Sequence, residues 1–159
     1  MIKTLLVDLT RCTNCEACVD VCSGVKLGVY SLRESRIRIK KNEELAIFIP
    51  LVCEQCREHP CTDVCPEKAI VYDPNLSIFV VDGDICTACG SCEEVCPYQG
   101  IFVEERTALK CDLCGGDPQC VTVCYPRALR YVEVGTDSVH QDLQFKAVKL
   151  EHIEGGDHG

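Results

Sequence analysis

Cysteine is the residue type that gives this sequence its chemistry: 16 of the 159 residues are cysteine, and all of them fall into four tight groups. Thiols form disulfides, and thiolates bind zinc or iron–sulfur clusters. The spacing of the cysteines has to indicate which of these three they form here. The gaps within the groups read 2-2-3, 2-4-3, 2-2-3 and 2-5-3 residues. Only the middle gap varies, alternating short and long, which indicates a duplicated pair. The groups are Cys12, Cys15, Cys18 and Cys22; Cys53, Cys56, Cys61 and Cys65; Cys86, Cys89, Cys92 and Cys96; and Cys111, Cys114, Cys120 and Cys124.

Disulfides and zinc fit this spacing poorly. A disulfide scaffold spreads its cysteines so that the bridges close long loops, whereas no cysteine here lies outside a group. Structural zinc usually takes two CxxC pairs separated by a longer loop, whereas three thiols crowd together in each group here. Zinc remains an alternative only for the fourth group, with its stretched gap. His59 lies inside the second group, which already has four thiols, and we expect it to face solvent.

The third group, together with Pro97, matches C-x2-C-x2-C-x3-C-P, the pattern that binds a [4Fe–4S] cluster in bacterial ferredoxins. Three closely spaced thiolates hold three corners of one cubane, and loop amides donate hydrogen bonds to the sulfurs. A small residue and a branched apolar residue follow the last cysteine of three groups at one offset: Ala69–Ile70, Gly100–Ile101 and Ala128–Leu129. The first group departs, because no proline follows Cys22. The sequence therefore predicts four [4Fe–4S] clusters.

Short strands are expected to position the four groups. Alternation predicts strands at 2–9 and 36–40, and the apolar run 45–49 leads into the second group. Segments 69–72 and 77–81 flank a turn and predict a hairpin, 100–104 and 107–110 predict a similar pair, and 128–134 closes the body. In the tail 135–159, apolar residues at helical spacing predict a helix that packs on its own domain or docks on a partner.

The linker lengths favour one sharing of cysteines among the clusters. The 20 residues between Cys65 and Cys86 hold one hairpin, as between the two motifs of a two-cluster ferredoxin, so the second and third groups pair and the outer groups remain for each other. Pairing in sequence order is the alternative, but its linkers of 30 and 14 residues are unlike each other. In two-cluster ferredoxins the fourth cysteine ligates the other cluster. The predicted ligand sets are Cys12, Cys15, Cys18 and Cys124 (site 1); Cys22, Cys111, Cys114 and Cys120 (site 2); Cys53, Cys56, Cys61 and Cys96 (site 3); and Cys65, Cys86, Cys89 and Cys92 (site 4).

Four groups in this order, over about residues 4–132, resemble the iron–sulfur electron-transfer subunits of molybdenum- or tungsten-pterin oxidoreductases. The small subunits of dimethyl sulfoxide reductase and formate dehydrogenase are of this type, and the partner subunits of tungsten aldehyde oxidoreductase and class II benzoyl-CoA reductase are similar. The resemblance implies an α+β fold in which duplicated bacterial 2[4Fe–4S] ferredoxin-like units are nested, with short strands and helices around the clusters. We expect a body at 1–134, with a central dicluster unit at about 46–98 and an outer unit from about 1–34 plus 99–134.

No motif in the sequence indicates catalysis by the chain itself: there is no GxSxG, no phosphate-binding loop and no recognisable acid–base pair. We therefore expect electron transfer within a larger oxidoreductase of anaerobic metabolism. The expected partner is a tungsten- or molybdenum-pterin catalytic subunit, with a ferredoxin or a further redox subunit as a second partner. The alternatives are a free, diffusing polyferredoxin and a subunit of a hydrogenase or carbon monoxide dehydrogenase system.

Charge and hydropathy narrow the partners and the location. A net charge of −9 argues against nucleic acid. The N-terminus lacks the features of a signal peptide, and the longest apolar run, nine residues, is too short to span a membrane. We expect a cytoplasmic protein, unless it is exported on its partner's signal.

Several basic residues lie close to the cysteines in sequence. We expect Arg57, Lys68, Lys110 and Arg127 to lie on solvated surface rather than to tune a cluster. The basic segment 33–41 is expected to be the wet face of a strand with Ile37 and Ile39 inward, and a docking patch for an acidic partner is its alternative.

Overall fold

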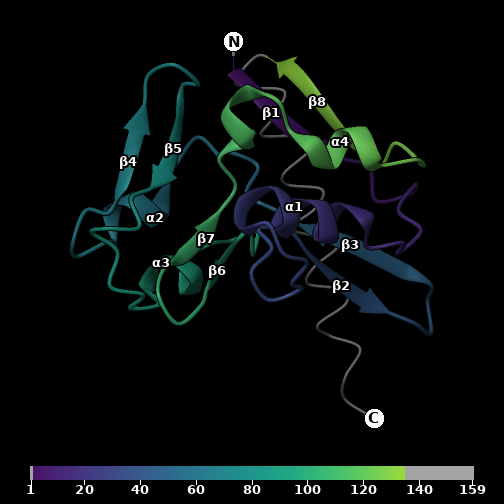
Figure 1. Cartoon of the computed structure of the whole chain (residues 1–159), viewed down its shortest axis with the longest axis horizontal. Helices are drawn as coiled ribbons and strands as arrows, with labels where there is room; N and C mark the ends of the chain where they lie inside the picture. The colour runs from purple at the N-terminus through teal and green to yellow at the C-terminus, as the bar shows by residue number, and fades with distance from the viewer. Residues whose placement is uncertain (1, 135–159) are drawn as a thin grey trace.

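The computed structural model describes residues 2–134, and the expected tail helix lies outside them. Within this range eight strands form four separate two-stranded antiparallel sheets, with short helices between them (Figure 1). The strands are β1 (Ile2–Val7), β2 (Arg38–Asn42), β3 (Ile47–Leu51), β4 (Ile70–Asp73), β5 (Ile78–Val81), β6 (Ile101–Val103), β7 (Ala108–Lys110) and β8 (Leu129–Val134). The helices are α1 (Ala17–Leu27), α2 (Pro60–Asp63), α3 (Ser91–Glu94) and α4 (Gln119–Val123), with a 3-10 helix η1 (Leu113–Gly116). The result is a small mixed α/β fold of short elements, as expected.

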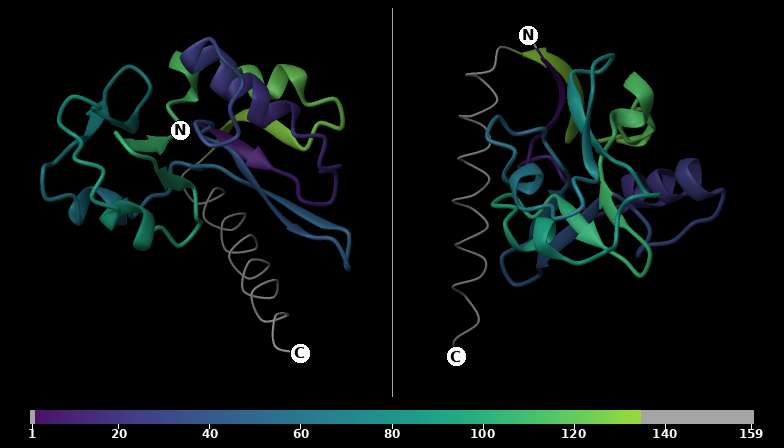
Figure 2. Two further views of the ribbon diagram at one scale, coloured as in Figure 1. Left: turned by 60° about the horizontal axis from the view of Figure 1, so that its bottom comes forward. Right: turned by 90° about the vertical axis from the view of Figure 1, so that its left-hand side faces the viewer.

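The beginning and the end of the described chain pack against each other. β1 pairs with β8, so that Val7 lies opposite Leu129, and α1 packs against α4. The middle of the chain pairs with itself: β4 with β5, β6 with β7, and α2 against α3 (Figures 1 and 2). The first and fourth cysteine groups therefore lie on one pair of helices and their flanking loops, and the second and third groups on another.

Both predicted hairpins form where the turn residues placed them. In β4–β5, Asp73 lies opposite Ile78, and its carboxylate accepts a hydrogen bond of 2.8 Å from the amide of Asn75 within the turn. This is the local bond by which aspartate favours turns. β2 also forms, two residues later than its predicted start. It pairs with β3, which begins within the apolar run 45–49 and leads into the second cysteine group.

Proline sets the length of the helices next to the cysteines. Pro66 and Pro97 directly follow the last cysteine of the second and third groups, and the helices there, α2 and α3, have only four residues each. A proline cannot continue a helix, because its ring clashes with the preceding turn. No proline follows Cys22, and α1 runs for 11 residues before it ends at Gly28, whose φ of 72° suits glycine.

Cysteines make up a large part of the buried apolar clusters. The largest cluster combines side chains such as Leu5, Ile37 and Leu129 with five cysteines: Cys18, Cys22, Cys53, Cys111 and Cys120. A second cluster contains Cys61 and Cys92. Small domains with thin apolar cores usually need metals or disulfides to stay folded, so the fold depends on what these thiols bind.

The basic segment 33–41 is paired within the chain. Arg33 and Arg38 both contact the carboxylate of Glu104, at 2.6 and 2.5 Å, and the Arg38 guanidinium lies 4.4 Å from the centre of the Phe102 ring. Lys41 forms an ion pair with Glu16. As expected, Ile37 is buried. Among residues 2–134, no helix has both the length and the apolar character that a membrane crossing requires.

Candidate metal centres

Three pockets are each lined by four cysteines that come from two different groups. Their volumes, including space open to solvent, are about 310, 370 and 350 Å³ for sites 1, 3 and 4. In each pocket, three cysteines of one group meet the last cysteine of another: Cys12, Cys15 and Cys18 with Cys124; Cys53, Cys56 and Cys61 with Cys96; and Cys86, Cys89 and Cys92 with Cys65.

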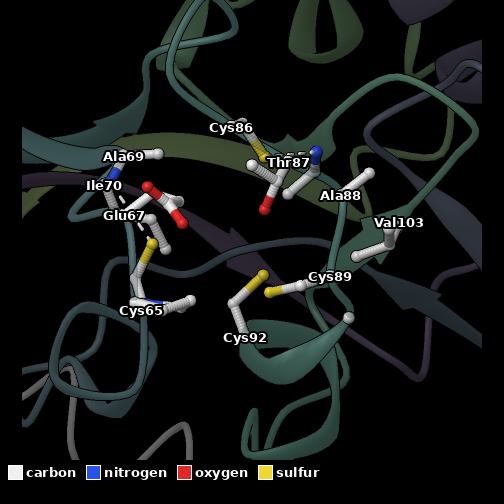
Figure 3. A pocket seen from close by; sticks show the side chains of 13 residues that line it. Cys65, Glu67, Ala69, Ile70, Cys86, Thr87, Ala88, Cys89, Cys92 and Val103 are labelled. Carbon is white, nitrogen blue, oxygen red and sulfur yellow. Dashed lines mark hydrogen bonds between the residues drawn. The ribbon is translucent and has the colours of Figure 1, made fainter.

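Figure 3 shows how the pocket of site 4 is built. The sulfurs of Cys65, Cys86, Cys89 and Cys92 point toward its centre. Cys92 lies on α3, Cys86 and Cys89 come from the loop before that helix, and Cys65 arrives from the segment after α2. The packing of α2 against α3 therefore brings the fourth thiol to the other three.

Site 2 lies where α1 packs against α4. Cys22 is on α1, Cys120 is on α4, and Cys111 and Cys114 flank the start of η1. Burial, and next the charges of Cys22 and Cys114, raise the pKa of the Cys120 thiol to about 12, which requires these sulfurs to be near one another. An ion pair of 2.7 Å between Lys26 and Asp112 joins the same two parts of the chain.

A backbone amide donates a hydrogen bond to the sulfur of the last cysteine in every group. The donors are Arg36 to Cys22, Ala69 to Cys65, Gly100 to Cys96 and Leu129 to Cys124, at 3.2–3.4 Å. Such bonds stabilise a thiolate and the cluster it binds. Three of these donors, Ala69, Gly100 and Leu129, belong to the recurring small–apolar pairs, so these pairs supply amides to the cysteine sulfurs. In the fourth group the proline stands one position later, at Pro126, and the donor also moves one residue on, from the small residue to Leu129.

The loops between the first two cysteines share a strained backbone that sequence reasoning missed. The residue before the second cysteine has a positive φ in all four groups: 58° at Asn14, 54° at Gln55, 54° at Ala88 and 54° at Leu113. This conformation costs about 1–2 kcal/mol for a residue with a side chain. Only Asn14 is a residue type that tolerates it, so three of the four positions carried no signal in the sequence.

In the absence of metal, burial favours the protonated form of several of these thiols. It raises the pKa of Cys18 and Cys61 to about 12 and that of Cys56 and Cys92 to about 11. Cys89 is exposed, and the hydroxyl of Ser91 lowers its pKa. Because metals bind the thiolate, filling these sites releases protons and is favoured as pH rises.

The arrangement of sulfurs fits an iron–sulfur cluster better than a single ion. Among residues 2–134, no three His, Cys, Asp or Glu side chains stand close enough together to hold one metal ion. Four sulfurs instead surround each of the three pockets. A cubane takes one thiolate on each of its four irons, so its ligands stand apart in this way.

Removal of the metal is expected to unfold the chain. The thiols form much of the buried apolar clusters, and structural metal sites contribute roughly 10–16 kcal/mol of binding free energy in peptides, as much as the whole net stability of a typical domain. Circular dichroism of reduced protein after anoxic chelation should show loss of the strand signal and of cooperative unfolding. A metal-free chain that unfolds cooperatively near the temperature of the loaded protein would show that the apolar clusters suffice.

Two residues near site 3 are placed differently from expectation. His59 is half-buried rather than solvent-facing: it lines the pocket and packs against Phe79, with ring centres 4.5 Å apart. Burial, and next the charge of Lys110, lower the pKa of His59. Lys110 is only 4% exposed, so the expectation of solvated surface was wrong there, while Lys68 and Arg127 are exposed.

Comparison with known proteins agrees with this geometry. Residues 45–134 match the family model of the 4Fe-4S dicluster domain. The chain is 33% identical over 153 residues to a ferredoxin of Methanocaldococcus jannaschii, covering 93% of this chain and 92% of that one. It is also 33% identical over 123 residues to the polyferredoxin-like subunit of the aliphatic sulfonate oxidoreductase of Pyrococcus furiosus, covering 76% of this chain and 70% of that subunit.

Among solved structures, the fold is similar to a chain of the active site complex BamBC of benzoyl-coenzyme A reductase. The TM-score is 0.51 and the identity 24%, covering 99% of this chain and 92% of that one. Pockets of four thiols, amides that donate to their sulfurs and these relatives lead to one assignment. The chain belongs to the 4Fe-4S dicluster domain family and is a ferredoxin-like protein that binds [4Fe–4S] clusters.

Proposed function

We propose that the chain is the electron-transfer subunit of a larger oxidoreductase and holds four [4Fe–4S] clusters at sites 1–4. The observation that carries the proposal is that three pockets each collect four thiols from two cysteine groups, while the members of the fourth set lie together between α1 and α4. A [4Fe–4S] cluster supplies one-electron chemistry between its 2+ and 1+ cores. The chain itself supplies the ligands, the hydrogen bonds to sulfur and the exclusion of water.

The sites form a row in the order 1, 2, 3, 4. Sites 1 and 2 are neighbours because α1 carries Cys18 and Cys22. Between sites 2 and 3, the charge of Cys53 acts on the thiol of Cys111. Sites 3 and 4 are neighbours because α2 carries Cys61 of site 3, α3 carries Cys92 of site 4, and the two helices pack together.

The two ends of this row are the parts that face solvent. Of the 16 cysteines only Cys15, in site 1, and Cys89, in site 4, are exposed. Three of the four thiols in site 2 and two of the four in site 3 are buried, and the others are partly buried. Partners that give or take electrons are therefore expected to dock near Cys15 at one end and near Cys89 at the other.

The expected partner at one end is a catalytic subunit with a tungsten or molybdenum pterin. A catalytic partner is supported by the relatives, since one is a polyferredoxin-like subunit of an aliphatic sulfonate oxidoreductase and the similar solved structure is an active site complex. The tungsten or molybdenum pterin rests on the resemblance of the cysteine pattern alone. A free polyferredoxin is the second candidate, because the ferredoxin of Methanocaldococcus jannaschii matches nearly end to end.

Purification from the native cells separates these candidates. The chain, tagged and isolated without oxygen, should bring down a larger subunit in constant ratio, and metal analysis of the complex should find tungsten or molybdenum. If the chain elutes alone near 17.6 kDa with its clusters intact, it is a free carrier. If it elutes with a large subunit that contains neither metal, the subunit role stands and the pterin partner is wrong.

A further inference from the structure

A lysine is buried beside site 3. The side chain of Lys110 comes from the end of β7, is 4% exposed and lines the pocket formed by Cys53, Cys56, Cys61 and Cys96. Burying an ammonium group is costly unless it is paired and hydrogen-bonded. A lysine in this position is therefore held there by specific contacts.

Two neutral oxygens hold the ammonium group. Lys110 Nζ donates to Oε1 of Gln55 at 2.7 Å and to the backbone carbonyl of Phe79. Gln55 is 3% exposed, and its amide nitrogen donates to the carbonyl of Cys111 at 2.8 Å, so the lysine is connected to the backbone of site 2 as well. Neither hydrogen-bond acceptor carries a charge that would cancel the positive charge of the ammonium group.

Within residues 2–134, no cation lines the pockets of sites 1 and 4. The charged residue that lines the pocket of site 4 is Glu67, and in site 1 it is Glu16, which is paired with Lys41. The pocket of site 3 is lined by Lys110 and also by Glu54. Burial raises the pKa of the Cys61 thiol, and the positive charge of Lys110 acts against this rise. Burial also raises the pKa of the Tyr98 hydroxyl, and the negative charge of Glu54 adds to that rise.

We propose that Lys110 raises the reduction potential of the cluster at site 3 and makes site 3 the electron-accepting member of the site 3–site 4 pair. The inference rests on the proposed function, since it takes the ligand set of site 3 as given. With four thiolates the site carries a charge of about −2 when oxidised and about −3 when reduced. A fixed cation stabilises the more negative state, and burial keeps water from screening the interaction.

The placement of Lys110 gives this effect a role in the row of sites. Lys110 and Gln55 lie between site 3 and the backbone of Cys111 in site 2, where the middle of the chain meets the outer segments. Because reduction is favoured at site 3, electrons that enter at the exposed end near Cys89 move toward the interior. Site 3 then holds an electron next to site 2.

The test is a redox titration of the anoxically prepared full chain, followed by electron paramagnetic resonance, for the parent protein and for Lys110→Met, Lys110→Arg and Lys68→Met. Lys110→Met should lower one potential by about 59 mV, which is a tenfold loss in the equilibrium constant for reduction. Lys110→Arg keeps the charge and should restore most of that shift. Lys68→Met removes an exposed lysine near Cys65 and should move no potential, because water screens it.

A ligand exchange identifies the site that moves. Cys56→Ser places an oxygen ligand at site 3 and so marks the spectrum of that site. The potential lowered by Lys110→Met has to belong to the marked spectrum; a shift in another cluster overturns the inference. Four unchanged potentials with unchanged iron content also overturn it and leave the proposed function intact.

A second substitution covers the case in which Lys110→Met loses iron. Gln55→Glu keeps the side-chain volume and the contact to Lys110, loses the hydrogen bond that the Gln55 amide donates to the carbonyl of Cys111, and brings a negative charge beside the ammonium group. It should lower the same potential, and no shift in that variant overturns the inference. The proposed function fails by a different readout: the parent chain would bind far fewer than about sixteen irons, four for each cluster.

Discussion

Replacing Cys124 by alanine should remove the cluster at site 1, not the one built on the other cysteines of its own group. Cys124 lines a pocket with Cys12, Cys15 and Cys18, although more than 100 residues separate them in sequence. The iron content should fall from about sixteen to about twelve per chain. Removing one ligand leaves Cys12, Cys15 and Cys18 as an incomplete site, so the loss should be nearly complete.

Cysteine labelling shows which site is lost. After brief alkylation of the native Cys124→Ala protein, mass spectrometry should find Cys12, Cys15 and Cys18 modified and Cys111, Cys114 and Cys120 protected. Cys65→Ala is the matched control in the middle of the chain, and it should expose Cys86, Cys89 and Cys92. If Cys124→Ala exposes Cys111, Cys114 and Cys120 instead, the crossed ligand sets are wrong. The nested division into a central unit at about 46–98 and an outer unit then fails with them.

Replacing Gly100 by alanine is expected to damage site 3. A Cβ atom at this position would lie 2.6 Å from the carbonyl oxygen of Val52 and 2.7 Å from the amide nitrogen of Cys53. Both atoms belong to the backbone, so neither can move aside by a side-chain rotation. Overpacking in a buried region costs about 1–3 kcal/mol, and relief of this contact has to displace the first ligand of site 3. Thermal unfolding should occur at lower temperature, and about four irons should be lost.

Gly83→Ala is the control for this substitution. A Cβ atom at Gly83 meets only the hydroxyl of Thr107, at an ordinary 3.9 Å. That variant should keep its iron and its unfolding temperature. If Gly100→Ala also keeps both, the backbone of Val52 and Cys53 can shift without loss of the ligand, and the close approach does not constrain the site.

Local features of the fold were predictable because they depend on short stretches of chain. Asp73 and the proline-containing turn after it predicted the β4–β5 hairpin, and alternation predicted β2 to within two residues. The absence of proline after Cys22 was visible in the sequence, but no helix was predicted there, and only the structure shows that α1 runs to Leu27. Propensity and turn chemistry act over a few residues, so these predictions needed no partner segment.

The backbone of the ligand loops was not predictable in the same way. Gln55, Ala88 and Leu113 adopt a left-handed conformation that their residue types do not favour. Such strain is common at binding sites. A pattern recurring at one position in four groups is visible only after folding.

The sequence by itself determined the chemistry of this protein: sixteen thiols in four groups at ferredoxin spacing, and a family that binds [4Fe–4S] clusters. Spacing carries this information because three ligands of one cubane must lie within a few residues. The linker lengths favoured one sharing of the thiols among the clusters, and which distant thiol ligates each cluster stays a prediction. Only the tertiary structure shows that Gly100 touches the backbone of Cys53 and that Lys110 is buried beside site 3 rather than solvated. These depend on contacts between segments far apart in the chain, which local sequence patterns do not specify.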